Sequence, residues 1–375
     1  MNFSFETVPQ IVFETGAAAR LGDIVKDRMQ RPCVVTDKGV IGAGLIDDAL
    51  SSLKAAGLDY YLFDGVEADP PAATVRGAID AARTHNSDGV IGFGGGSSMD
   101  TAKVIAILIK SSQSLEDIYG MDQVRGARAP LILLPTTAGT GSEVTNISVI
   151  TTDDEQKVGV LARQLYADTA ILDASLTLSM PRHVTSATGI DAMVHAIEAY
   201  TTKHKKNPVS DALATKALQL LSSNIVRACD EPGDVSAREA MLLGAMLAGQ
   251  AFSNAPCAAV HAMAYPLGVH FHVPHGLANS LMLAPVLNFN IPAADKLYAE
   301  LGPVIDASSS ATAFVEKLSE ICVATGVKQR LSEVGVSHNV LPKLAEDAVK
   351  IERLMRNNPR EVTYDDALKL YTEVL

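Results

Sequence analysis

Short apolar runs alternate with helix-like stretches through the first half of the chain. Residues 9–13 alternate and are β-branched, and two further apolar runs occupy residues 32–37 and 89–93, with helical stretches at 45–56 and 74–84 between them. Strands separated by helices of about ten to fifteen residues are typical of βαβ units, which build a mostly parallel sheet. We therefore expect a Rossmann-like α/β domain, with residues 9–13 as an edge or N-terminal strand.

The composition changes from Pro181 onward, where alanine, leucine and methionine dominate and β-branched runs become few. Helical periodicity covers residues 185–223 and 237–252, and Thr363 suits the N-cap of a final amphipathic helix. A chain of 375 residues suggests two domains, at roughly 150 residues each. We predict an α/β domain over residues 1–180, followed by an all-α domain over residues 181–375.

Composition and charge exclude several classes of protein. The chain is 47% hydrophobic and 20% charged, as is ordinary for a globular enzyme. Its net charge is −12 and its longest basic run is only residues 203–206, which argues against a nucleic-acid partner. The longest apolar runs, such as residues 104–109, are far shorter than a membrane span. We expect neither nucleic acid nor membrane as a partner.

The N-terminal residues and the cysteines indicate a compartment. Residues 1–6 contain no basic region and no apolar core, so we expect no secretory signal. No Cys-x-x-Cys pair occurs, and the cysteines are far apart in the sequence: Cys33, Cys229, Cys257 and Cys322. They are typical of reduced, mostly buried thiols, and we expect a cytoplasmic protein.

Two histidine-containing segments predict a metal site. Asp191 and His195 are four residues apart in a stretch rich in helix formers, so both lie on one helix face. His261 begins a short helical pattern that Pro266 and Gly268 are expected to end, and His275 follows fourteen residues after His261. Three imidazoles and one carboxylate suit a catalytic divalent metal with an open position. One such Asp/His pair alone is more often a surface contact or a helix cap, so the prediction of a metal site rests on the two segments taken together.

Two glycine-containing loops predict a phosphate site. Residues 94–98 lie between an apolar strand and a helix that begins near Met99. Glycines there let backbone amides approach a ligand, and the helix N-terminus attracts negative charge, which suits a pyrophosphate. Such a turn can also be only a turn, and it lacks the Gly-x-Gly-x-x-Gly pattern. The threonines and glycines of residues 135–143 strengthen the prediction.

Asp37 stands at the carboxyl end of an early strand, where doubly wound sheets bind their ligands. An acid there can accept the ribose hydroxyls of NAD and repels the 2′-phosphate of NADP. Two unit charges about 4 Å apart repel by roughly 1 to 4 kcal/mol, enough to favour NAD. The alternative is an ordinary turn aspartate.

Together these segments resemble the iron-dependent (group III) alcohol dehydrogenases. The resemblance covers nearly the whole chain, and it rests on residues 94–103, 135–143, 189–195 and 261–276 in that order. It implies metal ligands at Asp191, His195, His261 and His275, and it implies Fe²⁺, although the Irving–Williams order makes such a site bind Zn²⁺ more tightly and another divalent metal remains open. Cys257 is not needed as a ligand, since this set is complete.

The resemblance also implies a cofactor site for NAD. Asp69 occupies a position near the adenosine where similar sequences often carry asparagine, and Lys157 matches a lysine near the nicotinamide ribose. The remaining predicted cofactor residues come from the two loops: Gly95, Gly96, Ser97, Thr136, Thr137 and Thr140.

Tyr265 departs from the pattern, because many family members carry histidine four residues after the third ligand. A histidine can exchange protons near neutral pH, whereas a phenol can do so only if its environment shifts it. Tyr265 and His270 are therefore the candidate catalytic residues, with His272 as a further candidate in the same loop, and the alternative for the two histidines is a structural or solvated role.

The expected reaction is direct hydride transfer between an alcohol or aldehyde and NAD, with the metal as a Lewis acid. A sugar- or hydroxy-acid dehydrogenase of the same family is an alternative. A dehydroquinate synthase-like lyase shares the architecture but would require a basic phosphate pocket, and the basic residues here are dispersed. A structural metal protein would not need Asp37 and both loops. The resemblance implies a homodimer or a larger homo-oligomer.

Overall fold

The computed structural model describes residues 2–375, which form two compact units. The α/β unit comprises residues 7–137 and 141–179, and the helical unit comprises residues 2–6, 138–140 and 180–375. An α/β region followed by a helical region is the predicted fold class. The division into functional domains at residue 180 stays a prediction, and two short segments from the first 180 residues group with the helical unit.

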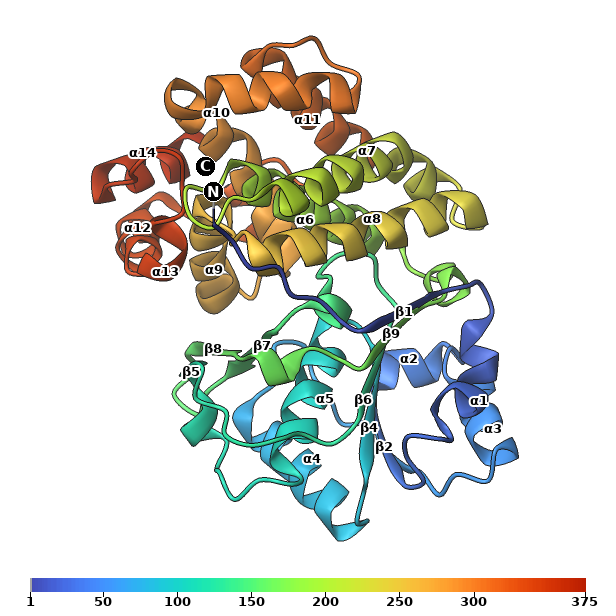
Figure 1. Ribbon diagram of the computed structural model, residues 1–375. Coiled ribbons are helices and arrows are strands. Elements are labelled where there is room, and N and C mark those ends of the chain that lie inside the picture. Colours follow the sequence, from blue (N-terminus) through green and yellow to red (C-terminus); the bar gives the residue numbers. More distant parts are fainter. Residues whose placement is uncertain (1) are drawn as a thin grey trace. The chain divides into compact units, whose positions relative to one another are not determined.

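The α/β unit is built on a six-stranded sheet in which all strands are parallel, in the order β1-β9-β6-β4-β2-β3 (Figure 1). The predicted parallel sheet and the predicted edge strand are confirmed. A second, three-stranded sheet has the order β5-β8-β7, with β7 and β8 antiparallel. The strands are β1 Gln10–Phe13, β2 Pro32–Val35, β3 Tyr61–Phe63, β4 Gly89–Gly94, β5 Gly120–Met121, β6 Leu131–Pro135, β7 Ile147–Thr151, β8 Lys157–Leu161 and β9 Thr169–Leu172.

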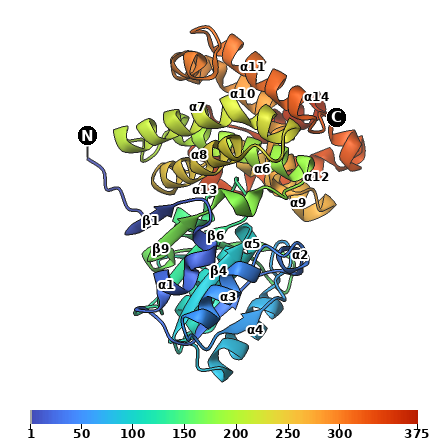
Figure 2. The same cartoon turned by 90° about the vertical axis from the view of Figure 1, so that its right-hand side faces the viewer.

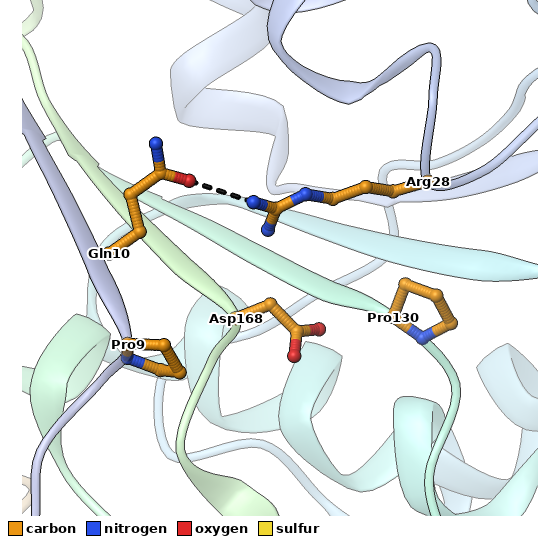
Figure 3. Close-up of a pocket in the computed structure, with 5 residues that line it drawn as sticks. All are labelled: Pro9, Gln10, Arg28, Pro130 and Asp168. Atoms are coloured by element: carbon orange, nitrogen blue, oxygen red, sulfur yellow. Dashed lines mark hydrogen bonds between the residues drawn. The ribbon is translucent and has the colours of Figure 1, made fainter.

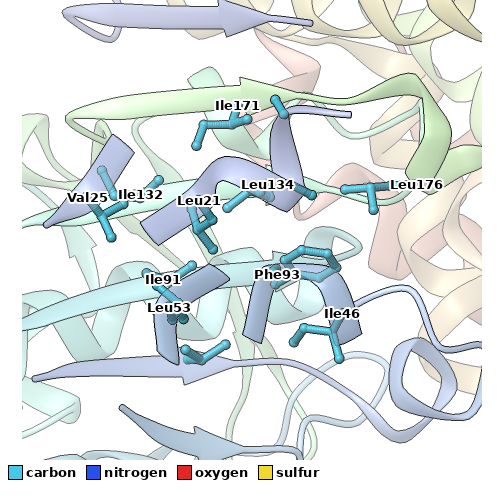
Figure 4. Packing of buried hydrophobic residues seen from close by; sticks show 14 of the residues in the cluster. Leu21, Val25, Ile46, Leu53, Ile91, Phe93, Ile132, Leu134, Ile171 and Leu176 are labelled. Atoms are coloured by element: carbon cyan, nitrogen blue, oxygen red, sulfur yellow. The ribbon is translucent and has the colours of Figure 1, made fainter. Parts of the chain in front are cut away.

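Helices cover both faces of the six-stranded sheet. In Figure 1, α1 to α3 lie on one face and α4 and α5 on the other. On the first face, Leu21 and Leu53 pack against the strand residues Ile91 and Ile132 in one buried cluster (Figure 4). Burial on both faces explains why the strands are continuous apolar runs. The helices are α1 Leu21–Val25, α2 Lys38–Gly42, α3 Asp47–Ala55, α4 Ala72–Thr84 and α5 Gly96–Leu108.

The helical unit is organised around α6, which packs against α7, α8 and α10 (Figure 2). Most residues of α6 are buried on every side of the helix. A helix without a solvent-exposed face must bury any polar side chain it carries. The helices are α6 Arg182–Thr201, α7 Pro208–Asp230, α8 Val235–Asn254, α9 Ala259–Phe271, α10 His275–Leu301, α11 Ala311–Thr325, α12 Leu341–Val349, α13 Glu352–Met355 and α14 Tyr364–Glu373. Within residues 2–375, no helix is long and apolar enough to cross a membrane.

The expectation that Pro266 and Gly268 end the helix after His261 is wrong. Helix α9 continues through Pro266 to Phe271 and stops at His272, whose φ is 53°. Proline removes one backbone donor from the helix. The helix continues because its apolar residues are buried against α10 and α12, and this packing outweighs the lost hydrogen bond.

Candidate active site

The two glycine- and threonine-containing loops meet at the carboxyl edge of the parallel sheet. Gly94 on β4 is in register with Pro135 on β6, and Thr136 N donates to Gly94 O at 3.0 Å. A Cβ atom on Gly94, whose φ is 153°, would lie 2.6 Å from Ser98 Oγ, so the turn requires glycine there. The structure thus brings the predicted residues Gly95 and Thr136 to one edge.

The N-terminus of α5 offers backbone donors at this edge. Gly95 is its N-cap, and no side chain of the described residues caps it. A Cβ atom on Gly95 would lie 3.7 Å from Thr137, which places Thr137 beside this turn. Gly96 and Ser97 are the first two residues of the helix. Uncapped amides at a helix N-terminus form a site for a phosphate group.

Asp37 lies beside the same turn. It follows β2, its Oδ1 accepts from Val40 N at 3.0 Å and caps α2, and its Oδ2 accepts from Ser98 Oγ at 3.1 Å. These two hydrogen bonds tie the end of β2 to the glycine loop, and the cofactor role of Asp37 stays a prediction.

The other predicted cofactor residues are placed differently. Lys157 Nζ pairs with Asp69 Oδ1 at 2.7 Å. Asp69 has a φ of 51°, a conformation that asparagine and aspartate tolerate better than most residues. Thr140 belongs to the helical unit, in contrast to the rest of this set. The cofactor roles of Asp69, Thr140 and Lys157 stay predictions, as do those of the residues in the two loops.

A buried network that the sequence analysis missed joins the two loop segments within the α/β unit. Lys103 on α5 is fully buried, and its Nζ donates to Ser142 Oγ at 2.8 Å, Thr145 Oγ1 at 3.0 Å and Ile147 O at 2.7 Å. The Asp100 carboxylate accepts from Ser142 Oγ at 2.6 Å and lies 3.6 Å from Lys103 Nζ. Lys103 therefore uses all three of its donors to hold the segment after β6.

An open hollow in the α/β unit lies elsewhere. It is lined by Pro9, Gln10, Arg28, Pro130 and Asp168, and Arg28 donates to Gln10 at 2.8 Å (Figure 3). Four of these residues directly precede or begin β1, β6 and β9, so the hollow is at the amino edge of the sheet. Parallel α/β sheets bind their ligands at the carboxyl edge. We therefore assign the hollow no part in the site.

The predicted metal ligands lie on three helices of the helical unit. Asp191 and His195 come from α6, His261 from α9, and His275 is the first residue of α10. Asp191 Oδ1 is 3.8 Å from His261 Nε2 and 3.6 Å from His275 Nε2. Oxygen and nitrogen ligands about 2.1 Å from one ion lie at such separations, so these three side chains fit a shared metal.

His195 belongs to a second group of side chains that shares His261. The ligand atoms of His195, Cys257 and His261 lie within 4.8 Å of one another. His195 Nδ1 and His261 Nε2 are buried and have no hydrogen-bond partner among the described residues. A buried nitrogen without a partner is costly unless it binds a ligand, so both atoms fit a metal. The structure therefore also places Cys257 near the proposed ligands.

Glu198 and Asn279 support these ligands, and the sequence analysis missed both. Glu198 Oε2 lies 2.6 Å from His261 Nδ1, and the carboxylate also accepts from Ala258 N at 2.9 Å and Val260 N at 2.7 Å. Because a carboxylate only accepts here, His261 donates from Nδ1 and directs its Nε2 lone pair to the ligand group. Asn279 Nδ2 donates to Asp191 Oδ1 at 2.6 Å.

A signal for Glu198 was present in the sequence. Asp191, His195 and Glu198 follow one another at spacings of four and three residues, so they share one face of the helix, and the other residues of 189–199 are apolar or glycine. The partner of Glu198, the start of α9, is about 60 residues away.

Burial and the neighbouring charges set the protonation of the ligand group. Burial lowers the pKa of His195 to about 3, which keeps its imidazole neutral. Burial alone would raise the pKa of Asp191, but His195, His275 and His261 outweigh it, and the pKa lies below its ordinary value. Burial alone would lower the pKa of His261, but Cys257 and Glu198 raise it well above its ordinary value.

The two candidate catalytic residues have different surroundings. Tyr265 lies one turn beyond His261 on α9, and its ring centre is 5.8 Å from that of His275. His270 Nε2 instead pairs with Asp347 on α12 at 2.8 Å. The structure thus brings Tyr265, but not His270, into contact with the proposed ligands. The catalytic roles of both residues stay predictions.

Comparison with known proteins gives consistent results. The family model for iron-containing alcohol dehydrogenase matches residues 9–174, and that for the C-terminal region of the same family matches residues 185–375. The chain is 35% identical to sulfoacetaldehyde reductase of Bilophila wadsworthia (strain 3_1_6) over an alignment of 385 positions, which covers 99% of this chain and 98% of the relative.

Two solved structures have the same fold over the whole chain. The crystal structure of a 1,3-propanediol oxidoreductase superposes with a TM-score of 0.96 at 30% identity, covering 100% of both chains. Sulfoacetaldehyde reductase from Bifidobacterium kashiwanohense, solved in complex with NAD⁺, has a TM-score of 0.90 at 27% identity and covers 100% of this chain and 99% of that one. Because family models match both halves of the chain, the protein belongs to the iron-containing alcohol dehydrogenase family and is an oxidoreductase of that type.

Proposed function

We propose that this protein transfers hydride reversibly between NAD(H) and a small alcohol or its aldehyde or ketone, with a divalent metal held by Asp191, His195, His261 and His275. The observation that carries the proposal is the buried Asp191 carboxylate, whose Oδ1 lies 3.6 Å from His275 Nε2 and 3.8 Å from His261 Nε2. The three relatives described above are named for a small aldehyde or a small diol, and one of them was solved with NAD⁺. Iron is the metal in the family description, and imidazole and carboxylate ligands suit zinc as well.

The two units divide the work in this proposal. The α/β unit binds NAD, with the amides at the start of α5 and the side chains of Thr136 and Thr137 around the pyrophosphate and Asp37 on the adenosine ribose. The helical unit holds the metal, which supplies a Lewis acid to the substrate oxygen. Glu198 orients His261, and Asn279 orients Asp191. Tyr265 borders the substrate beside His275.

In the proposed reaction, NAD⁺ accepts both electrons that the alcohol loses, so no other oxidant is needed. Hydride leaves the carbinol carbon for C4 of the nicotinamide, the carbinol oxygen loses its proton to solvent, and the products are NADH and a carbonyl compound. No side chain of the chain has to change oxidation state. Asp191 and the three histidines act as ligands, which leaves proton transfer to other groups.

Assays on protein loaded with Fe²⁺ or Zn²⁺ test the function. With NADH and a panel of short aldehydes, ketones and 2-oxo acids, we expect NADH consumption that depends on both carbonyl substrate and metal. The reverse reaction, with NAD⁺ and the matching alcohols, should produce NADH. Metal-loaded protein that consumes no NADH with any member of the panel would contradict the proposal.

Asp37 should set the choice of cofactor. Asp37→Gly removes the charge that faces a 2′-phosphate, so NADP use should improve relative to NAD by roughly five- to several-hundred-fold, as expected for 1 to 4 kcal/mol of repulsion. The measurement is the ratio of kcat/KM values for the two cofactors. Asp37→Asn is the matched control, because it keeps an acceptor for the α2 cap and removes only the charge. An unchanged ratio in both variants would show that Asp37 acts only on the loop.

We also propose that the protein is cytoplasmic and forms a homodimer. The four cysteines are buried and unpaired with one another, as in a reducing compartment. Strand β1 is an edge strand that exposes Ile11 and Phe13. An apolar edge strand is suited to pairing with a second chain.

A further inference from the structure

Arg353 is an exposed arginine on α13 that contacts Tyr265. Its Nη2 donates to Tyr265 Oη at 3.2 Å, and its guanidinium carbon is 5.7 Å from the centre of the Tyr265 ring. Within residues 2–375, no carboxylate lies within ion-pair distance of Arg353. The protein thus fixes the guanidinium with a neutral hydroxyl and an aromatic face, and leaves its charge uncompensated.

Tyr265 links Arg353 to the proposed metal ligands. The same ring that contacts the guanidinium lies 5.8 Å from the His275 ring, at an angle of 49°. Tyr265 also packs on an apolar cluster that includes Leu354 and Met355, the two residues that follow Arg353. Phe252 packs on this cluster and stacks on His195 at 4.2 Å. The apolar cluster that packs beside the proposed metal ligands is therefore bordered directly by the positively charged Arg353.

Other basic groups near this part of the helical unit differ from Arg353. His270 and Lys343 both pair with Asp347, each at 2.8 Å. The chain as a whole carries a net charge of −12, so its general field repels anions. A substrate with a negatively charged end would therefore need a nearby cation to bind it. Arg353 can supply that charge, because it contacts Tyr265, whose ring lies beside His275.

We propose that Arg353 determines specificity by binding the anionic end, a carboxylate or a sulfonate, of a short substrate whose hydroxyl or carbonyl group lies at the metal. The guanidinium presents paired donors that match the oxygens of such a group. The Tyr265 hydroxyl holds the guanidinium in place by accepting one hydrogen bond. The inference rests on the proposed function and names its substrate class: small aldehydes and alcohols with a terminal anion.

Matched substrates test the proposal on the metal-loaded enzyme with NADH. Butanal is the neutral substrate, 4-oxobutanoate carries a carboxylate, and 3-oxopropane-1-sulfonate carries a sulfonate, which separates the two anions. Arg353→Met should lower kcat/KM for the preferred anionic substrate by roughly 10- to 100-fold, as expected for losing a charge-assisted hydrogen bond. Butanal should react as before. Arg353→Lys should restore part of the kcat/KM for the anionic substrate, since lysine keeps the positive charge but lacks the paired donors of the guanidinium.

Arg356→Met is the matched control, because Arg356 is an exposed arginine three residues further along the chain. It should leave all three substrates unaffected. Tyr265→Phe should weaken use of the anionic substrate less than Arg353→Met does, because only the hydrogen bond that orients the guanidinium is lost. An equal loss for butanal and the anionic substrates in Arg353→Met would overturn the proposal.

A binding measurement separates this inference from the proposed function. Butanoate and propane-1-sulfonate are titrated calorimetrically into metal-loaded protein with NAD⁺, with butanamide as the neutral ligand. Anion binding that Arg353→Met abolishes supports the anion site, even if no aldehyde is reduced and the proposed function fails. Anions that bind wild-type protein and Arg353→Met alike, or that bind neither, overturn it.

Discussion

Asp191→Ala and His261→Ala are expected to purify without metal and to lose nearly all turnover, while they still bind NAD. Each variant removes a ligand from the group in which the Asp191 carboxylate lies 3.8 Å from His261 Nε2. A Lewis acid supplies several kcal/mol of transition-state stabilisation, so its loss should lower kcat by about 10³-fold or more. Metal content is measured by elemental analysis, and NAD binding by calorimetry.

Glu198→Gln should have an intermediate effect. It keeps the shape and an acceptor oxygen but loses the charge that orients His261, and such changes lower metal affinity by roughly 10- to 100-fold. His183→Ala is the matched control, because His183 is an exposed histidine at the start of the same helix α6. Full metal content in Asp191→Ala or His261→Ala would refute the ligand assignment. Loss of metal in Cys257→Ala would instead add Cys257 to the set.

Lys103→Met should destabilise the α/β unit by about 3 to 5 kcal/mol, the usual cost of removing one partner from a buried charged pair. Lys103 is fully buried with Asp100 and Glu143 nearby, and its loss leaves the Ser142 and Thr145 hydroxyls without their donor. Because the network holds the segment after β6, the KM for NAD should also rise. The measurement is the midpoint of urea unfolding.

Lys110→Met is the control for this prediction, because Lys110 is exposed just beyond the end of α5. It should change stability by less than about 0.5 kcal/mol. Equal unfolding midpoints for Lys103→Met and Lys110→Met would show that the buried network contributes no net stability.

Glu143 adds a dependence on pH. Burial raises the pKa of Glu143 from 4.5 to about 7 in the folded chain. An acid whose pKa is raised by folding contributes stability below its unfolded pKa and loses it as the pH rises through the folded value. Stability should therefore fall between about pH 4.5 and 7, and Glu143→Gln should flatten this fall. Without Lys103, the attraction that favours ionised Glu143 is gone, so the fall should extend to higher pH.

The local patterns of the sequence were sufficient for the layout of the chain. Alternating strands and helices predicted the parallel sheet, and strand residues buried on both faces made that pattern strong. The spacing of Asp191 and His195 placed both on one helix face, and the glycines after β4 marked the turn at the carboxyl edge. These features depend on neighbours within a few residues, so they can be recognised without tertiary contacts.

Packing between distant segments decided the rest. Pro266 lies inside α9 because α10 and α12 cover that helix, and Thr140 groups with the helical unit although its neighbours in the sequence do not. Glu198 reaches the start of α9 from about 60 residues away, and Arg353 reaches Tyr265 across 88 residues. No local pattern records such partners, because a buried side chain finds its partner only when separate helices pack together.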